Sequence, residues 1–169
     1  MKVKFFLIGI LILVFGLVGC GTTSTIKPEG TLKSMEAIPK LAFNSIKIEV
    51  KTEVQDSAEE AQQLKEFLVK EFKARNKEIK DFGSDAEMLV VIKHLKKVSR
   101  GSRLWWGSLA GKAEVKLDVL LTNNIQSINF SVDTTSAGAS SVGGWLSGYG
   151  GATEDALERT ASKIAVEVF

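Results

Sequence analysis

Four stretches of the chain carry the hydrophobic patterns of β-strands. In residues 45–54 and 113–121, apolar and charged residues alternate one by one, which is typical of a strand with one buried and one wet face. Residues 128–132 alternate in the same way. Residues 88–98 begin instead with an unbroken run, from Met88 to Ile92, that is apolar on both faces, which is typical of an interior strand. We therefore expect about four strands.

Two further stretches have the period of an amphipathic helix. Between about residues 57 and 76, apolar side chains recur every three or four positions, and Ser57 and Glu60 have the spacing of a capping box. Thr153 caps the second helix, whose first turn holds acidic residues that suit the positive end of the helix dipole. The apolar stripes are Ala61, Leu64, Leu68 and Phe72 in the first helix and Leu157, Ala161, Ile164 and Val168 in the second.

The order of these elements predicts an α+β fold. A single sheet of about four strands, in the chain order β-α-β-β-β-α, carries two helices on one face. The strand-helix-strand connection makes the first two strands parallel, and two reversals follow, the second through Asn123 and Asn124, which tolerate a left-handed backbone. The connection at residues 100–111 and the glycine-rich loop at 138–151 then leave the same end of the sheet, and the chain enters the first strand at the opposite end.

The chain begins with a segment unlike the rest. Lys2 and Lys4 precede an apolar run from Phe5 to Val18, and the small residue Gly19 follows. This arrangement is that of a secretory signal peptide, and the run of about 14 residues is shorter than the roughly 20 that a membrane-spanning helix needs. The expected division is a cleaved leader of residues 1–19, a flexible tether of residues 20–40 and a single domain of residues 41–169.

Residues Leu17, Val18, Gly19 and Cys20 resemble the lipobox of bacterial lipoproteins, in which the leader is cut before the cysteine and acyl chains are attached to it. The resemblance implies cleavage after Gly19 and lipidation of Cys20, the single cysteine of the chain. An uncleaved anchor helix and a secreted protein with a free thiol are the alternatives. Gly21 stands where enteric lipoproteins retained in the inner membrane have Asp, so the resemblance implies the outer membrane, with the domain facing the periplasm.

Charge and cysteine content narrow the classes of partner. The chain has 22 Lys and Arg against 20 Asp and Glu, and Lys2 and Lys4 lie in the leader, so the mature chain is balanced at 20 against 20. This balance predicts neither a nucleic-acid partner nor an anionic-surface partner. With Cys20 assigned to lipid, no disulfide can form within the chain, and stability must come from a packed core.

Candidate catalytic and cofactor motifs are weak. His94 is the single histidine, so one chain can form neither a Ser-His-Asp triad nor a multi-histidine metal site. Residues 107–112 resemble a phosphate-binding loop but lack one residue between the glycines, and the glycines at 148–151 lack the dinucleotide spacing. We therefore expect no enzyme activity, no cofactor, no metal and no small-molecule substrate.

Aromatic residues in the two long connections are the strongest candidates for an interaction site. Trp105 and Trp106 lie in one connection, and Trp145 and Tyr149 lie in the other. Two interpretations stay open. The rings can pack over glycines and close the end of the sheet, or they can form a contact surface, since Trp and Tyr are enriched in binding hot spots. Because the tether enters at the other end, we expect this cluster to point away from the anchoring membrane, toward a protein or a cell-wall ligand.

The second half of the chain carries a further resemblance. Residues 100–115, the glycine-rich loop and residues 156–158 in the closing helix are similar to an uncharacterised family of bacterial lipoproteins, known as a domain of unknown function. The resemblance spans about residues 88–169 and departs from the family at Asn123 and Asn124, where an Asp-Gly turn is usual. A looser, fold-level similarity links the layout to envelope lipoproteins that activate wall synthases or form secretion channels.

These patterns lead to one hypothesis and two alternatives. We expect a non-enzymatic outer-membrane lipoprotein of the bacterial envelope, held to the membrane by lipid on Cys20, that binds a protein partner through its aromatic residues. The first alternative is self-assembly into a ring through exposed strand edges. The second is an enzyme whose site has no recognisable motif.

Overall fold

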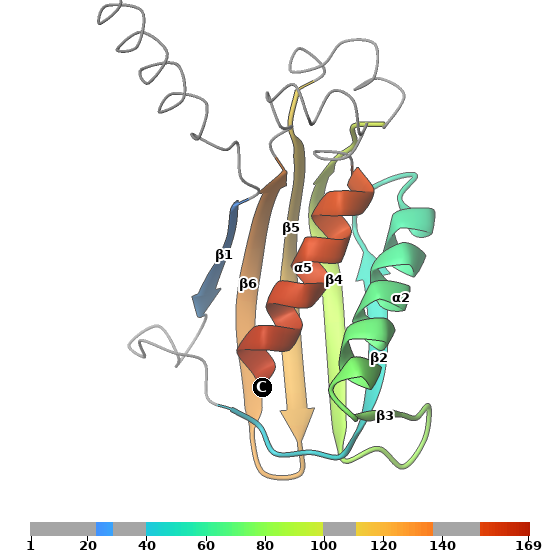
Figure 1. Ribbon diagram of the computed structural model, residues 1–169, viewed down its shortest axis with the longest axis vertical. Coiled ribbons are helices and arrows are strands. Elements are labelled where there is room, and N and C mark those ends of the chain that lie inside the picture. Colours follow the sequence, from blue (N-terminus) through green and yellow to red (C-terminus); the bar gives the residue numbers. More distant parts are fainter. Residues whose placement is uncertain (1–22, 29–39, 100–110, 137–152) are drawn as a thin grey trace, which may run out of the picture.

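The two helices of the protein lie together on one face of a single β-sheet (Figure 1). The computed structural model describes residues 23–28, 40–99, 111–136 and 153–169. In chain order the elements are β1 (Thr23–Pro28), β2 (Ser45–Thr52), α2 (Ala58–Ala74), β3 (Glu78–Ile79), β4 (Ala86–Lys96), β5 (Ala113–Asn123), β6 (Ser127–Ser136) and α5 (Thr153–Val168).

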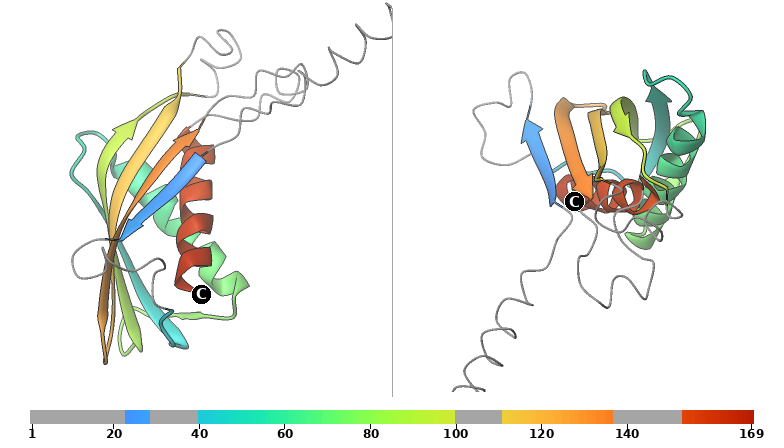
Figure 2. Two further views of the ribbon diagram at one scale, coloured as in Figure 1. Left: turned by 90° about the vertical axis from the view of Figure 1, so that its left-hand side faces the viewer. Right: turned by 90° about the horizontal axis from the view of Figure 1, so that it is seen from above.

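The sheet is mixed and has six strands in the order β1-β6-β5-β4-β2-β3. The crossover through α2 makes β2 and β4 parallel, as predicted, with Ile46 opposite Ala86. β4, β5 and β6 then follow one another in antiparallel pairs. β1 pairs antiparallel with β6 at the far edge, where Thr23 lies opposite Thr135. Figure 2 shows the twist of this sheet, with both helices on one side of it.

The expected number of strands is wrong, although the α+β class and the placement of two helices on one face are correct. Neither additional strand carries a hydrophobic pattern. β1 has one large aliphatic side chain, Ile26, among hydroxyl-bearing and charged residues, and edge strands are often polar. β3 spans only Glu78 and Ile79, too short for alternation to show. β1 lies inside the segment assigned to the tether, and the division into leader, tether and domain otherwise stays a prediction.

Alternate residues of the strands fill one core between the sheet and the helices, and both predicted helical stripes are buried in it. β4 is an interior strand, as predicted, and on its other face Leu89 and Val91 are half-buried. Within the described residues, no helix has both the length and the apolar character needed to span a membrane. The largest fully buried side chains are Phe72, Phe130, Ile46, Leu64, Leu68, Met88, Ile92, Leu117, Leu121, Ile128, Leu157 and Ile164.

The β5–β6 hairpin is closed by a side chain rather than by a left-handed backbone. Asn123 Oδ1 accepts hydrogen bonds from the backbone N–H groups of Ile125 and Gln126, both at 2.9 Å. The Asn123 N–H group donates to Gln126 O at 3.0 Å. Neither Asn123 nor Asn124 has the expected positive φ. Asn suits this turn because its side chain can replace a backbone acceptor.

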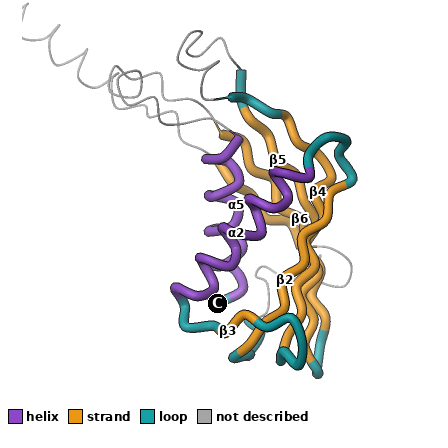
Figure 3. Tube along the Cα trace, turned by 90° about the vertical axis from the view of Figure 1, so that its right-hand side faces the viewer, coloured by secondary structure: helices purple, strands orange, loops and turns teal. Residues whose placement is uncertain are grey.

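Three phenylalanines and a lysine close the core at the hairpin end of the sheet. The Phe169 ring lies 5.3 Å from the Phe43 ring and 5.1 Å from the Phe72 ring, measured between centroids. Lys77 Nζ lies 5.0 Å from the ring centroids of both Phe43 and Phe169. Figure 3 shows how the chain turns after α2 at this end and leads into β3. The C-terminal helix is thus fixed to the start of the domain by aromatic packing.

Asp85 fixes the start of β2 to the start of β4. Its Oδ2 atom accepts the N–H groups of Asn44 and Ser45, each at 3.1 Å, and its own N–H group donates to Ser45 Oγ at 3.0 Å. The bond from Asn44 is the largest of the causes that lower the pKa of Asp85, followed by the bond from Ser45. The stability from these bonds is therefore present above the ordinary pKa of Asp and is lost as the pH falls through the lowered pKa.

Phe72 and Phe82 offer a matched test of the core, because one is 0% exposed and the other 91% exposed. We expect Phe72→Ala to lower the free energy of unfolding by about 3–5 kcal/mol, since it removes buried apolar surface and leaves a cavity. Phe82→Ala is expected to change it by no more than about 0.5 kcal/mol. Urea denaturation followed by circular dichroism measures both, and equal losses would contradict the assigned core.

Candidate functional site

The residues that the sequence assigns to lipidation and binding lie outside the described ranges. They are Leu17, Val18, Gly19 and Cys20, which precede β1, and Trp105, Trp106, Trp145 and Tyr149, which belong to residues 100–110 and 137–152. Their assignments stay predictions. The structure does place Thr23, which follows the first segment, and the residues on either side of 100–110 and 137–152.

The flanks of the two long connections lie at one end of the sheet. Ala113 at the start of β5 pairs with Ser136 at the end of β6, and the β4–β5 pairing reaches this end through Lys96. The Thr153 N–H group donates to Val98 O at 3.1 Å, which brings the start of α5 here as well. Both connections therefore leave the same end, as predicted. We name it the loop end and define it by Ser99, Gly111, Ser136 and Thr153.

β1 also begins at the loop end, so the chain first joins the sheet here and not at the opposite end, where it was expected. Thr23 lies opposite Thr135, and β1 then runs away from the loop end until Pro28 lies opposite Phe130. Cys20 is three residues before Thr23, and three residues span at most about 11 Å. The chain that follows the cysteine thus joins the sheet beside the aromatic connections. The expectation that these connections point away from the membrane took residue 45 as the start of the first strand, and β1 removes that premise. The direction in which the connections point stays a prediction.

A row of hydroxyl groups holds β1 to β6 and α5. Ser24 Oγ lies within hydrogen-bond distance of Thr134 Oγ1, at 2.9 Å, and Thr134 Oγ1 lies 2.8 Å from Thr160 Oγ1. Thr160 Oγ1 is also 2.7 Å from Ala156 O, and both threonines are buried. The sequence contained a signal for this row, since Thr134 continues the inward alternation of β6 one step beyond Val132. A threonine in a buried position needs such a partner.

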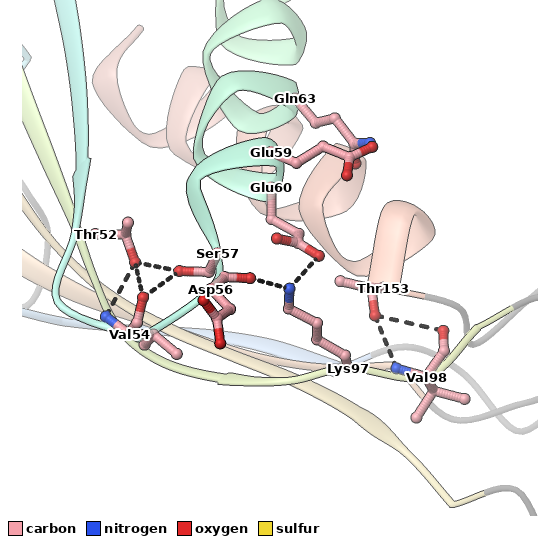
Figure 4. A network of polar contacts seen from close by, with 10 residues as sticks. All are labelled: Thr52, Val54, Asp56, Ser57, Glu59, Glu60, Gln63, Lys97, Val98 and Thr153. Atoms are coloured by element: carbon pink, nitrogen blue, oxygen red, sulfur yellow. Dashed lines mark hydrogen bonds and ion pairs between the residues drawn. The ribbon is translucent and has the colours of Figure 1, made fainter.

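The turn from β2 into α2 uses Ser57 differently from the predicted capping box (Figure 4). Ser57 Oγ donates to Val54 O at 2.6 Å and lies 2.5 Å from Thr52 Oγ1. Thr52 Oγ1 in turn accepts the Val54 N–H group at 3.0 Å. Within this described turn, Ser57 makes no side-chain hydrogen bond that caps α2. The hydroxyl closes the turn instead, so the expected reciprocal contact between Ser57 and Glu60 is absent there.

Glu60 pairs with Lys97, a residue just after β4. Its Oε1 atom lies 2.7 Å from Lys97 Nζ, which also donates to Asp56 O (Figure 4). The Glu60 side chain is 15% exposed and the Lys97 side chain is 44% exposed, so solvent screens the pair in part. The pair joins the start of α2 to the end of β4.

Thr153 joins the start of α5 to the same segment. Its Oγ1 atom accepts the Val98 N–H group at 2.8 Å and lies 3.3 Å from Val98 O (Figure 4). Thr153 was expected to be the cap of α5, and it is the first residue of this helix, with its hydroxyl bonded to the strand segment. The starts of both helices are therefore fixed to the chain that follows β4.

A cleft of about 250 Å³ lies between these two helix starts. Helix N-termini favour anions, but acidic side chains already occupy the first turns of both helices. No group of three His, Cys, Asp or Glu side chains that could hold a metal occurs in the described part of the chain. Within this lining Glu60 pairs with Lys97 and Thr153 bonds to Val98, so we assign these contacts a role in joining the helices to the sheet. The lining residues are Glu60, Gln63, Lys97, Val98, Ser99, Thr153 and Glu154.

The open face of the sheet carries His94 among ion pairs. His94 Nε2 lies 3.9 Å from Glu114 Oε2, and Lys93 Nζ lies 2.5 Å from Glu53 Oε1 and 3.8 Å from Asp118 Oδ2. The hydrogen bond to Glu53 is the largest cause that raises the pKa of Lys93. Exposed pairs of this kind contribute little to stability, because solvent and salt screen them. His94 thus lies on the polar strand face expected for it.

The chain is similar to known proteins at the level of fold. No family model matches it, and no curated protein matches it. Among solved structures, a variant PelC dodecamer from Paraburkholderia phytofirmans is similar with a TM-score of 0.53 at 8% identity, over 86% of this chain and 97% of that chain. A likeness at this identity concerns the fold alone.

Two further solved structures are similar with lower scores. A DUF330 protein from Xanthomonas campestris has a TM-score of 0.45 at 13% identity, over 85% of this chain and 90% of that chain. A minor lipoprotein from Acinetobacter baumannii has a TM-score of 0.37 at 9% identity, over 76% of this chain and 94% of that chain. The structures similar to this chain thus include one named as a minor lipoprotein and one of a domain family of unknown function, and the likeness to PelC is loose.

Proposed function

We propose that the protein is a non-enzymatic lipoprotein of the bacterial envelope, anchored by lipid on Cys20 to the outer membrane and facing the periplasm, that binds a protein partner at the membrane surface. The direction of β1 carries this proposal, because it brings the chain that follows Cys20 to the end of the sheet from which the aromatic connections leave.

The anchor has a simple physical basis. Several acyl chains on one cysteine hold a protein at a membrane far longer than one chain, which binds only marginally. β1 begins three residues after that cysteine, so the domain has little freedom to move away from the bilayer while β1 stays paired. The loop end is therefore the part of the domain nearest to the membrane.

The position of the loop end determines the kind of partner. Trp105, Trp106 and Trp145 belong to connections that start and finish at this end. Trp and Tyr combine a large apolar surface with a polar edge, and both are enriched in binding hot spots. We therefore expect a partner that is embedded in the same membrane or bound to it, rather than one that lies across the periplasm.

The proposal that the protein is not an enzyme rests on the residue types in its sequence. One histidine is too few for a triad or a multi-histidine metal site in one chain, and His94 lies half-exposed on the open face beside Glu114. The polar side chains of the cleft at the loop end, Glu60 and Lys97 above all, are engaged in contacts that join elements of the fold.

Replacement of Trp105, Trp106 and Trp145 by Ala is expected to reduce capture of the partner by in-cell crosslinking about tenfold or more, since hot-spot residues carry most of the binding energy. The control is Phe82→Ala with Ile125→Ala, which removes exposed apolar side chains at the hairpin end. Circular dichroism checks the fold of both variants. Unchanged capture by the folded tryptophan variant would count against binding at the loop end.

A second candidate function, self-assembly, is favoured by two open edges of the sheet. β1 forms one edge, and β3 covers only Ser45 and Ile46 of β2, so residues 47–52, which pair with β4 on one side, have no described strand on the other. Ile46 O accepts the Lys80 N–H group on the β3 side, and by strand alternation the N–H group of Val50 points to the same open side.

Pairing of β1 from one copy with β2 of the next would be a head-to-tail contact, and such contacts can close into a ring. The similar PelC structure is named as a dodecamer, which agrees with an assembly of this kind. Unpaired strand edges are otherwise a liability that proteins cover or block.

Val50→Pro tests the edge directly. It removes an N–H group from the open side, where proline is tolerated, so we expect it to convert the assembly into a monomer without loss of the fold. The mass of the variant is measured in mild detergent over a range of concentrations. The control is Leu120→Ala, which shortens an exposed apolar side chain on interior strand β5 and should leave the assembly intact. A monomeric mass for the unsubstituted chain at every concentration would exclude self-assembly.

A further inference from the structure

A second cleft, of about 270 Å³, lies between β1 and α5. We name it the β1–α5 cleft. Its walls carry two cationic and two hydroxyl side chains, a set of hydrogen-bond donors that suits the oxygens of a phosphate group. Lys40 adds a third cation beside it, because Lys40 Nζ donates to Val166 O at 3.2 Å. The lining residues are Ser24, Arg159, Ser162, Lys163 and Val166.

Cations exceed carboxylates around this cleft. Lys163 pairs with Glu167 at 2.6 Å, whereas Arg159 forms no ion pair with any described residue. Glu158, the neighbour of Arg159 in sequence, is paired with Lys70 of α2 at 3.3 Å. The mature chain is balanced in charge as a whole, so the composition conceals this local excess. An exposed guanidinium without a carboxylate partner is available for an external anion.

The cleft lies close to the predicted lipid anchor along the chain. Ser24, which lines it, is four residues after Cys20, and four residues span at most about 14 Å. The attraction between surface charges and lipid headgroups falls off within a Debye length of about 8 Å. Figure 2 shows α5 and β1 along one side of the domain, and the residues that line the cleft belong to these two elements.

We propose that the β1–α5 cleft binds the phosphate groups of anionic phospholipids in the membrane that holds Cys20. Arg159 and Lys163 are the cationic contacts, and Ser24 and Ser162 are the hydroxyl donors. This inference rests on the proposed function, because lipidation of Cys20 is what brings the cleft to the bilayer. Binding there turns the domain so that its β1 edge lies next to the membrane and its β2 edge lies away from it.

The test uses the full chain, processed and lipidated in cells and then reconstituted into vesicles of phosphatidylcholine alone or with about 30% phosphatidylglycerol. Since lipid occupies Cys20, a fluorophore attaches only to the thiol of Val166→Cys in the cleft or, in the control, to that of Phe82→Cys near the opposite edge. Nitroxide-labelled headgroups are expected to quench the probe at position 166 more strongly in the anionic vesicles and to leave the probe at position 82 unchanged.

Charge variants show whether the cleft itself is responsible. Each cation near an anionic surface contributes about a fivefold change in binding, so Arg159→Gln with Lys163→Gln should lower the ratio of docked to undocked protein about 20-fold. The matched control, Lys65→Gln with Lys73→Gln, removes two cations from α2 and should have little effect. Equal quenching in both kinds of vesicle, or an equal loss in the control, overturns the proposal.

Two other outcomes distinguish a failure of the lipid assignment from a failure of the proposed function. If inorganic phosphate without vesicles reduces labelling of Arg159 by an arginine-selective reagent, while phosphatidylglycerol leaves the quenching unchanged, the cleft binds a soluble phosphate and the lipid assignment is wrong. If the chain does not float with phosphatidylcholine vesicles, the lipid anchor itself is absent and the proposed function fails. Flotation without any effect of anionic lipid overturns the inference about the cleft alone.

Discussion

The pairing of β1 with β6 is the constraint on which the position of the whole domain relative to its anchor depends. Backbone pairing and the hydroxyl row from Ser24 through Thr134 to Thr160 determine both the place and the direction of this six-residue strand. Without it, about 20 residues of chain would connect Cys20 to the hairpin end of the sheet, with a root-mean-square reach of about 25 Å. Under the proposed anchoring at Cys20, one short polar strand thus decides which end and which edge face the membrane.

The two faces of the sheet have different roles. The face under α2 and α5 holds the continuous apolar core, and burial there supplies most of the stability. The open face is covered by exposed ion pairs that each contribute little, so it can face solvent without a cost in stability. The features to which we assign binding are therefore at the borders of the sheet. They are the loop end, the two edges and the side where β1 meets α5.

The parts of the fold that bury apolar side chains could be predicted from the sequence, because burial on one face imposes a period that the residues reveal. β5 and α5 are found where the pattern placed them. β1 could not be predicted in this way, since edge pairing uses backbone groups and leaves only Ile26 as a sign. Spacing also failed at Ser57, because a capping box needs its hydroxyl oxygen to accept the Glu60 N–H group, whereas in the structure the hydroxyl donates to Val54 O within the turn. The assignments of Cys20 to lipidation and of the aromatic residues to binding rest on the sequence alone. The end of the sheet at which the chain after Cys20 arrives could be inferred only from the direction of β1.

A disulfide between Ser24→Cys and Thr134→Cys in the lipidated full chain tests the pairing of β1 most directly. The two residues are partners across the strands, and their hydroxyl oxygens lie 2.9 Å apart, within the reach of a disulfide. We expect oxidation to join this pair, while Ser24→Cys with Ser136→Cys, two positions out of register on the same face, stays reduced. No disulfide in the first pair, or equal yields in both, would contradict the pairing and with it the position of the anchor at the loop end.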